Sequence, residues 1–269
     1  MASSDVSAVP PFRPTIAIGK PKLTSLFEVA TYSTDFSWRS LLLTAKPEID
    51  HIEKMLVKAQ SEEMGSVMAP ETWLYYPPRQ QVFRSLQYTP LDQVKVIILG
   101  MDPYPGRNAD GTSEACGIAF SCEQSVPASL KNIFLEIKRD YPDFVLPTVG
   151  DLRKWCQQGV LLMNASFTFL PIGDQTAQRR QQQLWLQLVH RIMGDVTTQQ
   201  KNLAICLWGR DAQRYNDYVS GSHLILTASH PSPRSFASTD EPFKGCSHFK
   251  KINDHLEKHG KAPIDWSLV

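Results

Sequence analysis

Four short apolar runs, rich in Val, Ile and Leu, predict buried β-strands. The runs are residues 94–99, 159–163, 203–208 and 223–227. Between them apolar residues recur at helical spacing. The helical stretches are marked by Leu130, Ile133, Phe134 and Ile137, by 184–193 and by 210–218. Strands that alternate with helices predict an α/β fold, in which a central four-stranded parallel twisted sheet is covered by helices on both faces.

The residues that follow these strands are candidates for chemistry, because parallel sheets bind ligands beyond the carboxyl ends of their strands. Asp102 follows the first predicted strand, Asn164 the second and His230 the fourth, whereas Gly209 and Arg210 follow the third. Each polar residue alone fits a structural role in a turn or loop. Their convergence on one edge favours a functional site instead.

Composition narrows the class of protein. The chain has 269 residues, of which 42% are hydrophobic, and this fits one sizeable domain. The formal net charge is +1, so a nucleic-acid partner would meet a local basic patch rather than global attraction. No apolar run is long enough to span a bilayer and no signal-peptide pattern is present, so we expect an intracellular protein without membrane contact.

The cysteines and the amino-terminal segment bear on disulfides, metal binding and domain boundaries. Five cysteines, an odd number without a C-x-x-C pair, argue against a disulfide framework and against a zinc site, and we expect no metal. Residues 1–35 carry Ser, Pro and Lys without sustained periodicity, and predict a mobile arm. No linker or repeat divides residues 36–269, which we interpret as one domain.

Four segments stand out by their order and spacing: GMDPY at 100–104, GIAFS at 117–121, GVLLMN at 159–164 and HPSP at 230–233. Together they resemble the signature motifs of the family 1 uracil-DNA glycosylases, and the similarity extends from about residue 75 to about residue 266. The resemblance implies that residues 36–269 are a catalytic domain. Such a domain flips uracil out of DNA and hydrolyses its N-glycosidic bond in base-excision repair, without a cofactor.

The resemblance also implies a role for each candidate residue. Asp102 would position or activate the water and stabilise the oxocarbenium-like sugar, and a neutral His230 would donate a hydrogen bond to the uracil oxygen that becomes anionic. The amide of Asn164 would pair with O4 and N3–H of uracil, and Phe120 would stack on the flipped base. Tyr104 would exclude the methyl group of thymine by steric overlap.

The chain departs from the family's usual motifs near this site. Met101, assigned to uracil binding, stands where Gln is usual and keeps a backbone N–H. Pro105 stands where His is usual and supplies no hydrogen-bond donor. Residues 107–116 form a longer loop than usual, which we expect to reshape the mouth of the pocket. Arg179 and Arg180 occupy the usual Ser-His positions, which predicts an altered network beside the catalytic carboxylate and reduced turnover.

Four further residues are assigned to DNA binding. Ser129, Ser232 and Ser235 match positions at which the family contacts phosphates. Arg234 replaces the usual DNA-inserting Leu, so we expect it to enter the duplex when the uridine leaves; an outer phosphate contact is the alternative. Some poxviral members share this Arg and a Pro at position 105, which raises a viral or otherwise divergent origin.

Two alternatives stay open on sequence grounds. A catalytically weak DNA-binding or replication-accessory protein on the same fold is the alternative to a glycosylase. Residues 20–27 loosely resemble the sliding-clamp-binding box of some nuclear members, with Leu23, Leu26 and Phe27 as anchors, although a hydrophobic segment that docks on the chain itself also fits. We expect a monomer in the nucleus, or in the cytoplasm if the source is bacterial or a cytoplasmic virus.

Overall fold

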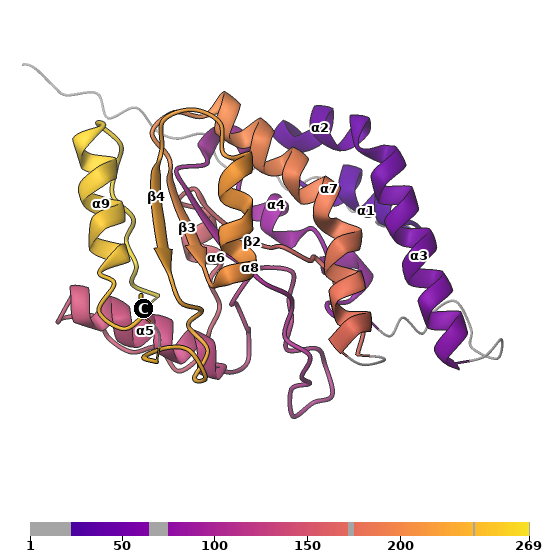
Figure 1. Cartoon of the computed structure of the whole chain (residues 1–269), viewed down its shortest axis with the longest axis horizontal. Coiled ribbons are helices and arrows are strands. Elements are labelled where there is room, and N and C mark those ends of the chain that lie inside the picture. Colours follow the sequence, from indigo (N-terminus) through magenta and orange to yellow (C-terminus); the bar gives the residue numbers. More distant parts are fainter. Residues whose placement is uncertain (1–22, 65–74, 172–174, 239, 269) are drawn as a thin grey trace, which may run out of the picture.

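A four-stranded sheet forms the centre of the computed structural model, which describes residues 23–64, 75–171, 175–238 and 240–268. All strands are parallel and lie in the order β2-β1-β3-β4 (Figure 1). The strands are β1 (Val96–Gly100), β2 (Val160–Asn164), β3 (Ala204–Trp208) and β4 (Leu224–Ala228). The predicted α/β architecture with helices on both faces is confirmed.

Each face of the sheet has its own hydrophobic core, because successive strand residues point to opposite sides. Ile97 and Leu99 of β1 belong to one cluster, and Val96 and Ile98 to the other. Helices of the first face are α1 (Leu26–Ser33), α2 (Arg39–Thr44), α3 (Lys46–Met64), α4 (Arg84–Tyr88) and α7 (Gln175–Gln199). Helices of the second face are α5 (Ala128–Asp140), α6 (Arg153–Cys156) and α9 (His248–Lys258).

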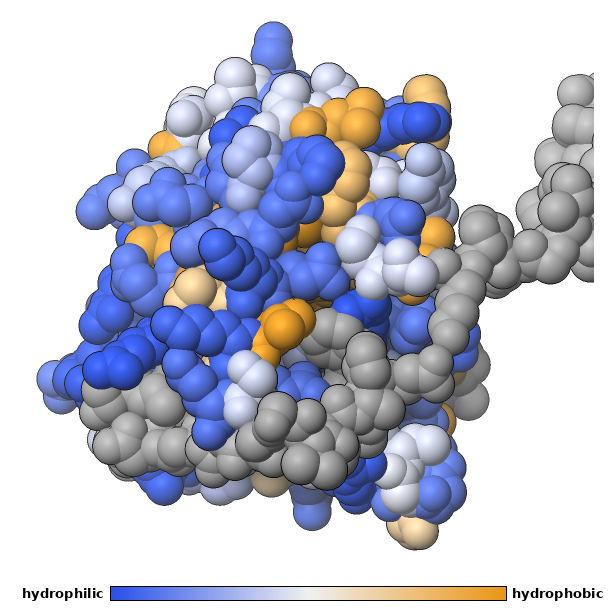
Figure 2. All heavy atoms as spheres, turned by 90° about the vertical axis from the view of Figure 1, so that its right-hand side faces the viewer, coloured by the Kyte–Doolittle hydropathy of each residue, from blue (hydrophilic) through white to orange (hydrophobic). Residues whose placement is uncertain are grey.

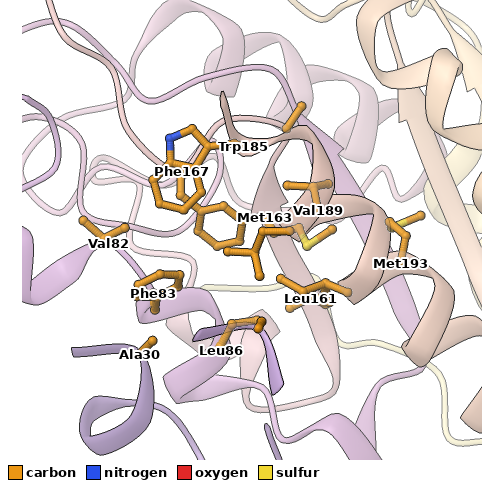
Figure 3. Packing of buried hydrophobic residues seen from close by; sticks show 14 of the residues in the cluster. Ala30, Val82, Phe83, Leu86, Leu161, Met163, Phe167, Trp185, Val189 and Met193 are labelled. Carbon is orange, nitrogen blue, oxygen red and sulfur yellow. The ribbon is translucent and has the colours of Figure 1, made fainter. Parts of the chain in front are cut away.

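The first core joins segments that are far apart in the chain. Figure 3 shows Phe83 and Leu86 beside Met163 of β2. Phe167, which follows β2, and Trp185 of α7 complete the cluster. The rings of Phe167 and Trp185 lie 5.2 Å apart between centroids. On the outside, the side of the molecule seen in Figure 2 is mostly hydrophilic. No helix in the described residues is long and apolar enough to cross a membrane.

The predicted helix over 210–218 is wrong as a single α-helix. The structure has a four-residue helix α8 (Arg210–Gln213), followed by a 3-10 helix η4 (Arg214–Tyr218). A 3-10 helix brings residues three apart onto one face. This places the rings of both Tyr215 and Tyr218 against His190, at centroid distances of 5.2 and 3.4 Å. Tertiary contact with α7 therefore accompanies the tighter winding.

Part of the predicted amino-terminal arm is built into the domain. Residues 1–22 lie outside the described residues, but α1 begins at Leu26 and is capped by Ser25, which forms a capping box with Glu28. Leu26 is fully buried in the first core, and Leu23 and Phe27 pack against that core. The domain therefore begins no later than α1, and the three residues suggested as clamp anchors contact this chain itself.

Candidate active site

The carboxyl edge of the sheet brings together the candidate residues from three strand ends. Asn164 is the last residue of β2 and pairs in register with Gly100 of β1, which Asp102 follows two positions later. His230 lies two positions beyond β4. Seven predicted residues line one cavity of about 140 Å³: Met101, Asp102, Tyr104, Phe120, Ser129, Asn164 and His230. Ser232, Arg234 and Ser235 lie outside this lining, in the loop that follows His230.

The floor of the cavity depends on a glycine. A Cβ at Gly100 would lie 2.3 Å from Oδ1 of Asn164 and 3.2 Å from Cβ of Ala119. Any side chain at position 100 would therefore displace the amide that the sequence assigns to base recognition. The glycine of the GMDPY motif thus makes room for the asparagine of the neighbouring strand.

Phe120 has an unusual backbone that is secured by Tyr104. Its φ is 63°, in the left-handed region that aromatic residues rarely adopt. The hydroxyl of Tyr104 donates a hydrogen bond of 3.1 Å to the carbonyl oxygen of Phe120. The Phe120 ring lies 5.8 Å, between centroids, from both Trp208 and His230. Local strain of this kind is retained when it holds a functional side chain in place.

The geometry determines which nitrogen of His230 carries the proton. Burial lowers the pKa of His230 to about 4, so the ring is neutral at neutral pH. Its Nδ1 accepts a hydrogen bond of 3.1 Å from the backbone N–H of Ser232. The single proton therefore lies on Nε2, which makes that nitrogen a donor. Gly209, at φ 93°, allows the close approach of His230, because a Cβ there would lie 3.1 Å from the histidine Cβ.

Asp102 lies at the boundary of two hollows. Burial raises its pKa to about 6, and the charge of Asp211 adds to the increase, so Asp102 is mostly ionised at neutral pH. Besides the first cavity, Asp102 and Met101 line a second hollow of about 580 Å³. Arg179 and Arg180 are both exposed, and of the two Arg179 lines this hollow. The structure thus places one of the two substituted arginines in the same hollow as the carboxylate.

Sequence reasoning missed Asp211, although a signal for it was present. Asp211 follows directly after Gly209 and Arg210, the two residues assigned to the end of the third predicted strand. Asp211 lines the second hollow together with Asp102. Applying the strand-end rule to the whole turn after each strand would have found it.

The loop after His230 is held by its own hydrogen bonds and by α5. Oγ of Ser235 donates to the carbonyl oxygen of His230 at 2.8 Å, and lies 3.0 Å from Oγ of Ser232. Nδ2 of Asn132 donates to the carbonyl oxygen of Pro231 at 2.8 Å. Arg234 is exposed at this loop. The loop therefore carries a fixed histidine at its base and a cation in solvent.

Two further elements border the cavity. Ser129 lies in the first turn of α5, which begins after Pro127 without a side-chain cap, so backbone N–H groups there remain available to an anion. The long loop over 107–116 folds into a hairpin, in which the N–H of Asn108 donates to the carbonyl of Thr112 at 2.8 Å. In Figure 1 this hairpin extends beyond the carboxyl ends of the strands. Its last residues, 115 and 116, line the cavity.

Within the described residues no group of three or more His, Cys, Asp or Glu side chains could hold a metal ion. The small cavity has an aromatic wall and is surrounded by a buried carboxylate, a neutral histidine donor and an amide. This arrangement suits an enzyme that holds a single nucleobase and stabilises charge as the base departs.

Comparison with known proteins identifies the family. Residues 86–257 match the model of the uracil DNA glycosylase superfamily. The chain is 40% identical over 196 residues to a uracil-DNA glycosylase of Dichelobacter nodosus, covering 72% of this chain and 80% of that protein. It is 34% identical over 240 residues to one of Proteus mirabilis, covering 88% and 98%.

A solved structure agrees with the sequence relatives. The crystal structure of mimivirus uracil-DNA glycosylase superposes with a TM-score of 0.75 at 26% identity, covering 86% of each chain. This chain belongs to the uracil-DNA glycosylase superfamily, which confirms the resemblance seen in its motifs. Its class of activity is accordingly that of a hydrolase acting on N-glycosyl bonds in DNA repair.

Proposed function

We propose that this chain releases free uracil from DNA by hydrolysing the N-glycosidic bond of a flipped deoxyuridine, which leaves an abasic site for base-excision repair. Membership of the superfamily supports the activity. The observation that carries the assignment of residues is the single cavity that Asp102, Asn164 and His230 line together.

Base recognition takes place between an aromatic ring and an amide. The flipped uracil stacks on Phe120, while the side chain of Asn164 accepts from N3–H and donates to O4. Cytosine presents a donor where uracil has O4, and so mismatches this pattern. Met101 contributes its backbone N–H to the same pocket, and Tyr104 blocks the space that the methyl group of thymine needs.

Bond cleavage produces a negative charge on uracil and a positive charge on the sugar, and the site stabilises both. The electron pair of the N-glycosidic bond leaves with uracil, whose oxygen accepts a hydrogen bond from Nε2 of His230. The positive charge that develops on the sugar is stabilised by the carboxylate of Asp102. Water then adds to the anomeric carbon and its proton passes to Asp102. Asp102 returns this proton to the solvent and the uracil anion takes one up from the solvent, so the products are free uracil and an abasic sugar.

DNA is held at the rim of the pocket. The first turn of α5 at Ser129 binds one phosphate, and the Ser232 hydroxyl, which lies 3.0 Å from that of Ser235, binds another. Arg234 enters the duplex at the vacated position, where its planar guanidinium stacks on neighbouring bases. The nuclear location, the monomeric state and the contact with a sliding clamp stay predictions, as does the catalytic role of residues 36–269, whose domain also includes α1.

The test is an assay of free uracil released from a defined oligonucleotide, with and without a chelator. We expect release that persists in the chelator and is lost in Asp102→Asn. Tight binding of the uracil-containing DNA without release would favour the catalytically weak DNA-binding alternative, for which Pro105 and Arg179 are the relevant departures. Release that requires a metal ion would contradict the proposed mechanism.

A further inference from the structure

One strand end of the sheet has no role in the proposed reaction. The ends of β1, β2 and β4 supply Asp102, Asn164 and His230, and β3 lies between β1 and β4. The turn after β3 therefore lies between the catalytic aspartate and the histidine along the edge. Asp211 is the ionisable side chain of that turn that lines the hollow beside Asp102.

Asp211 is placed to act on Asp102 from the second hollow, outside the base cavity. It is partly buried at the start of α8, and it shares with Asp102 the hollow of about 580 Å³. Asp102 also lines the base cavity, which Asp211 does not. The carboxylate of Asp211 can therefore interact with that of Asp102 without contacting uracil.

The other charges of the hollow do not cancel this carboxylate. Its ion-pair partner is Arg214 of η4, with Nη1 at 3.5 Å. The Arg214 side chain is 78% exposed and that of Asp211 42%, so water weakens the pair. Arg179 of α7 and Tyr215 of η4 are the remaining titratable or charged groups that line the hollow. His230 lies on the other side of Asp102, in the base cavity.

A negative charge at this place opposes ionisation of Asp102 and favours protonation of His230. Both effects are present. The pKa of Asp102 is raised first by burial and then by Asp211, and the pKa of His230, which burial lowers, is raised in part by Asp211. Among the described residues, Asp211 is the charged group that acts on both Asp102 and His230.

We propose that Asp211 is a positioning residue of this active site, whose charge sets the pH at which Asp102 becomes available as a carboxylate. The inference rests on the proposed function, since Asp102 has this task only in a glycosylase. Asp211 acts through Asp102 and touches neither uracil nor sugar.

The experiment is the rate of uracil release in single turnover, at saturating protein, from a single-stranded oligonucleotide between about pH 4 and about pH 9. The unsubstituted chain should lose activity on acidification with a midpoint near the Asp102 pKa of about 6. Asp211→Asn should move the midpoint to lower pH by about one unit, whatever the height of its plateau. Asp217→Asn, an exposed acid of η4, serves as the matched control and should leave the midpoint unchanged.

Arg214→Gln adds a variant with the opposite sign. Loss of this cation leaves Asp211 less compensated, so the midpoint should move to higher pH by less than one unit, because Arg214 is exposed. This exposed substitution keeps the test decisive even where Asp211→Asn fails to fold. A lower midpoint in Arg214→Gln, or an unchanged midpoint in folded Asp211→Asn, overturns this inference alone. Absence of release by the unsubstituted chain at every pH overturns the proposed function instead.

Discussion

The base cavity and the loop after His230 lie side by side but are built in different ways. The cavity takes its shape from strand ends and from backbone that is packed on the core: Gly100 opens the floor for Asn164, and Phe120 is locked by Tyr104. The loop is held by short hydrogen bonds among its own serines and by Asn132, and it leaves Arg234 in solvent. The difference teaches that recognition and chemistry rest on the fold, whereas contact with DNA rests on a surface loop.

The largest effect should follow from the carboxylate at the boundary of the cavity. Asp102→Asn keeps the size of the side chain but removes its charge, so stabilisation of the sugar cation is lost. We expect the single-turnover rate to fall by about 10³-fold while DNA binding is kept. Parallel measurements of release and of binding to the uracil-containing oligonucleotide check this. A nearly normal rate would remove Asp102 from the chemistry.

His230 joins the two regions, because it lies at the base of the loop and lines the cavity. His230→Ala removes the Nε2–H donor to the departing uracil, and we expect a loss of about 10²-fold. The loss should be similar on single-stranded and duplex substrates, since the donor acts on the base after it has left the stack. A loss confined to duplex DNA would instead assign the histidine to DNA handling.

Tyr104 tests the shape of the cavity. Tyr104→Ala opens space for a methyl group, so the variant should release thymine, with discrimination between uracil and thymine reduced by about 10-fold to 100-fold. Tyr104→Phe is the control, because it keeps the ring and loses only the hydroxyl bond to Phe120. Competing oligonucleotides with one or the other base measure the ratio. Thymine release by the Phe variant as well would point to the backbone of Phe120 rather than to steric exclusion.

Arg234 tests the loop alone. Arg234→Ala should slow release from duplex DNA by about tenfold and change release from a single strand little, because an unstacked uracil needs no residue to fill its place. Arg234→Leu should recover much of the duplex rate by apolar contact. Equal losses on both substrates that diminish with added salt would indicate an outer phosphate contact.

A separate effect is on stability, and it distinguishes the cavity from the surface. The pKa of Asp102 rises from 3.8 to about 6 on folding, so its charged form opposes folding fully above pH 6 and not at all below about pH 4. Asp102→Asn should therefore raise the free energy of unfolding by up to about 3 kcal/mol at neutral pH, and by little near pH 4. Urea unfolding at both pH values measures this, with Asp217→Asn as an exposed control. A gain that does not depend on pH would contradict the linkage.

Much of the site could be predicted because it lies where local patterns end. The apolar runs marked all four strands, and the polar residues after three of them pointed to Asp102, Asn164 and His230 before any distance was known. The motif resemblance then supplied Phe120 and Tyr104, which strand periodicity alone does not reveal. Such features can be predicted from the sequence because they repeat over a few residues or follow a strand directly.

Other properties arose only when distant segments met. The burial that neutralises His230, the N–H of Ser232 that selects its tautomer, and the charge of Asp211 beside Asp102 depend on the neighbours that folding brings together. The 3-10 winding of η4 accompanies ring contacts with α7, and Leu26 enters the core although its flanking sequence suggests an arm. The sequence alone determined where the strands lie along the chain and which chemical groups follow them, because these are local. Only the tertiary structure decided their ionisation and hydrogen bonding, because desolvation and charge act through space.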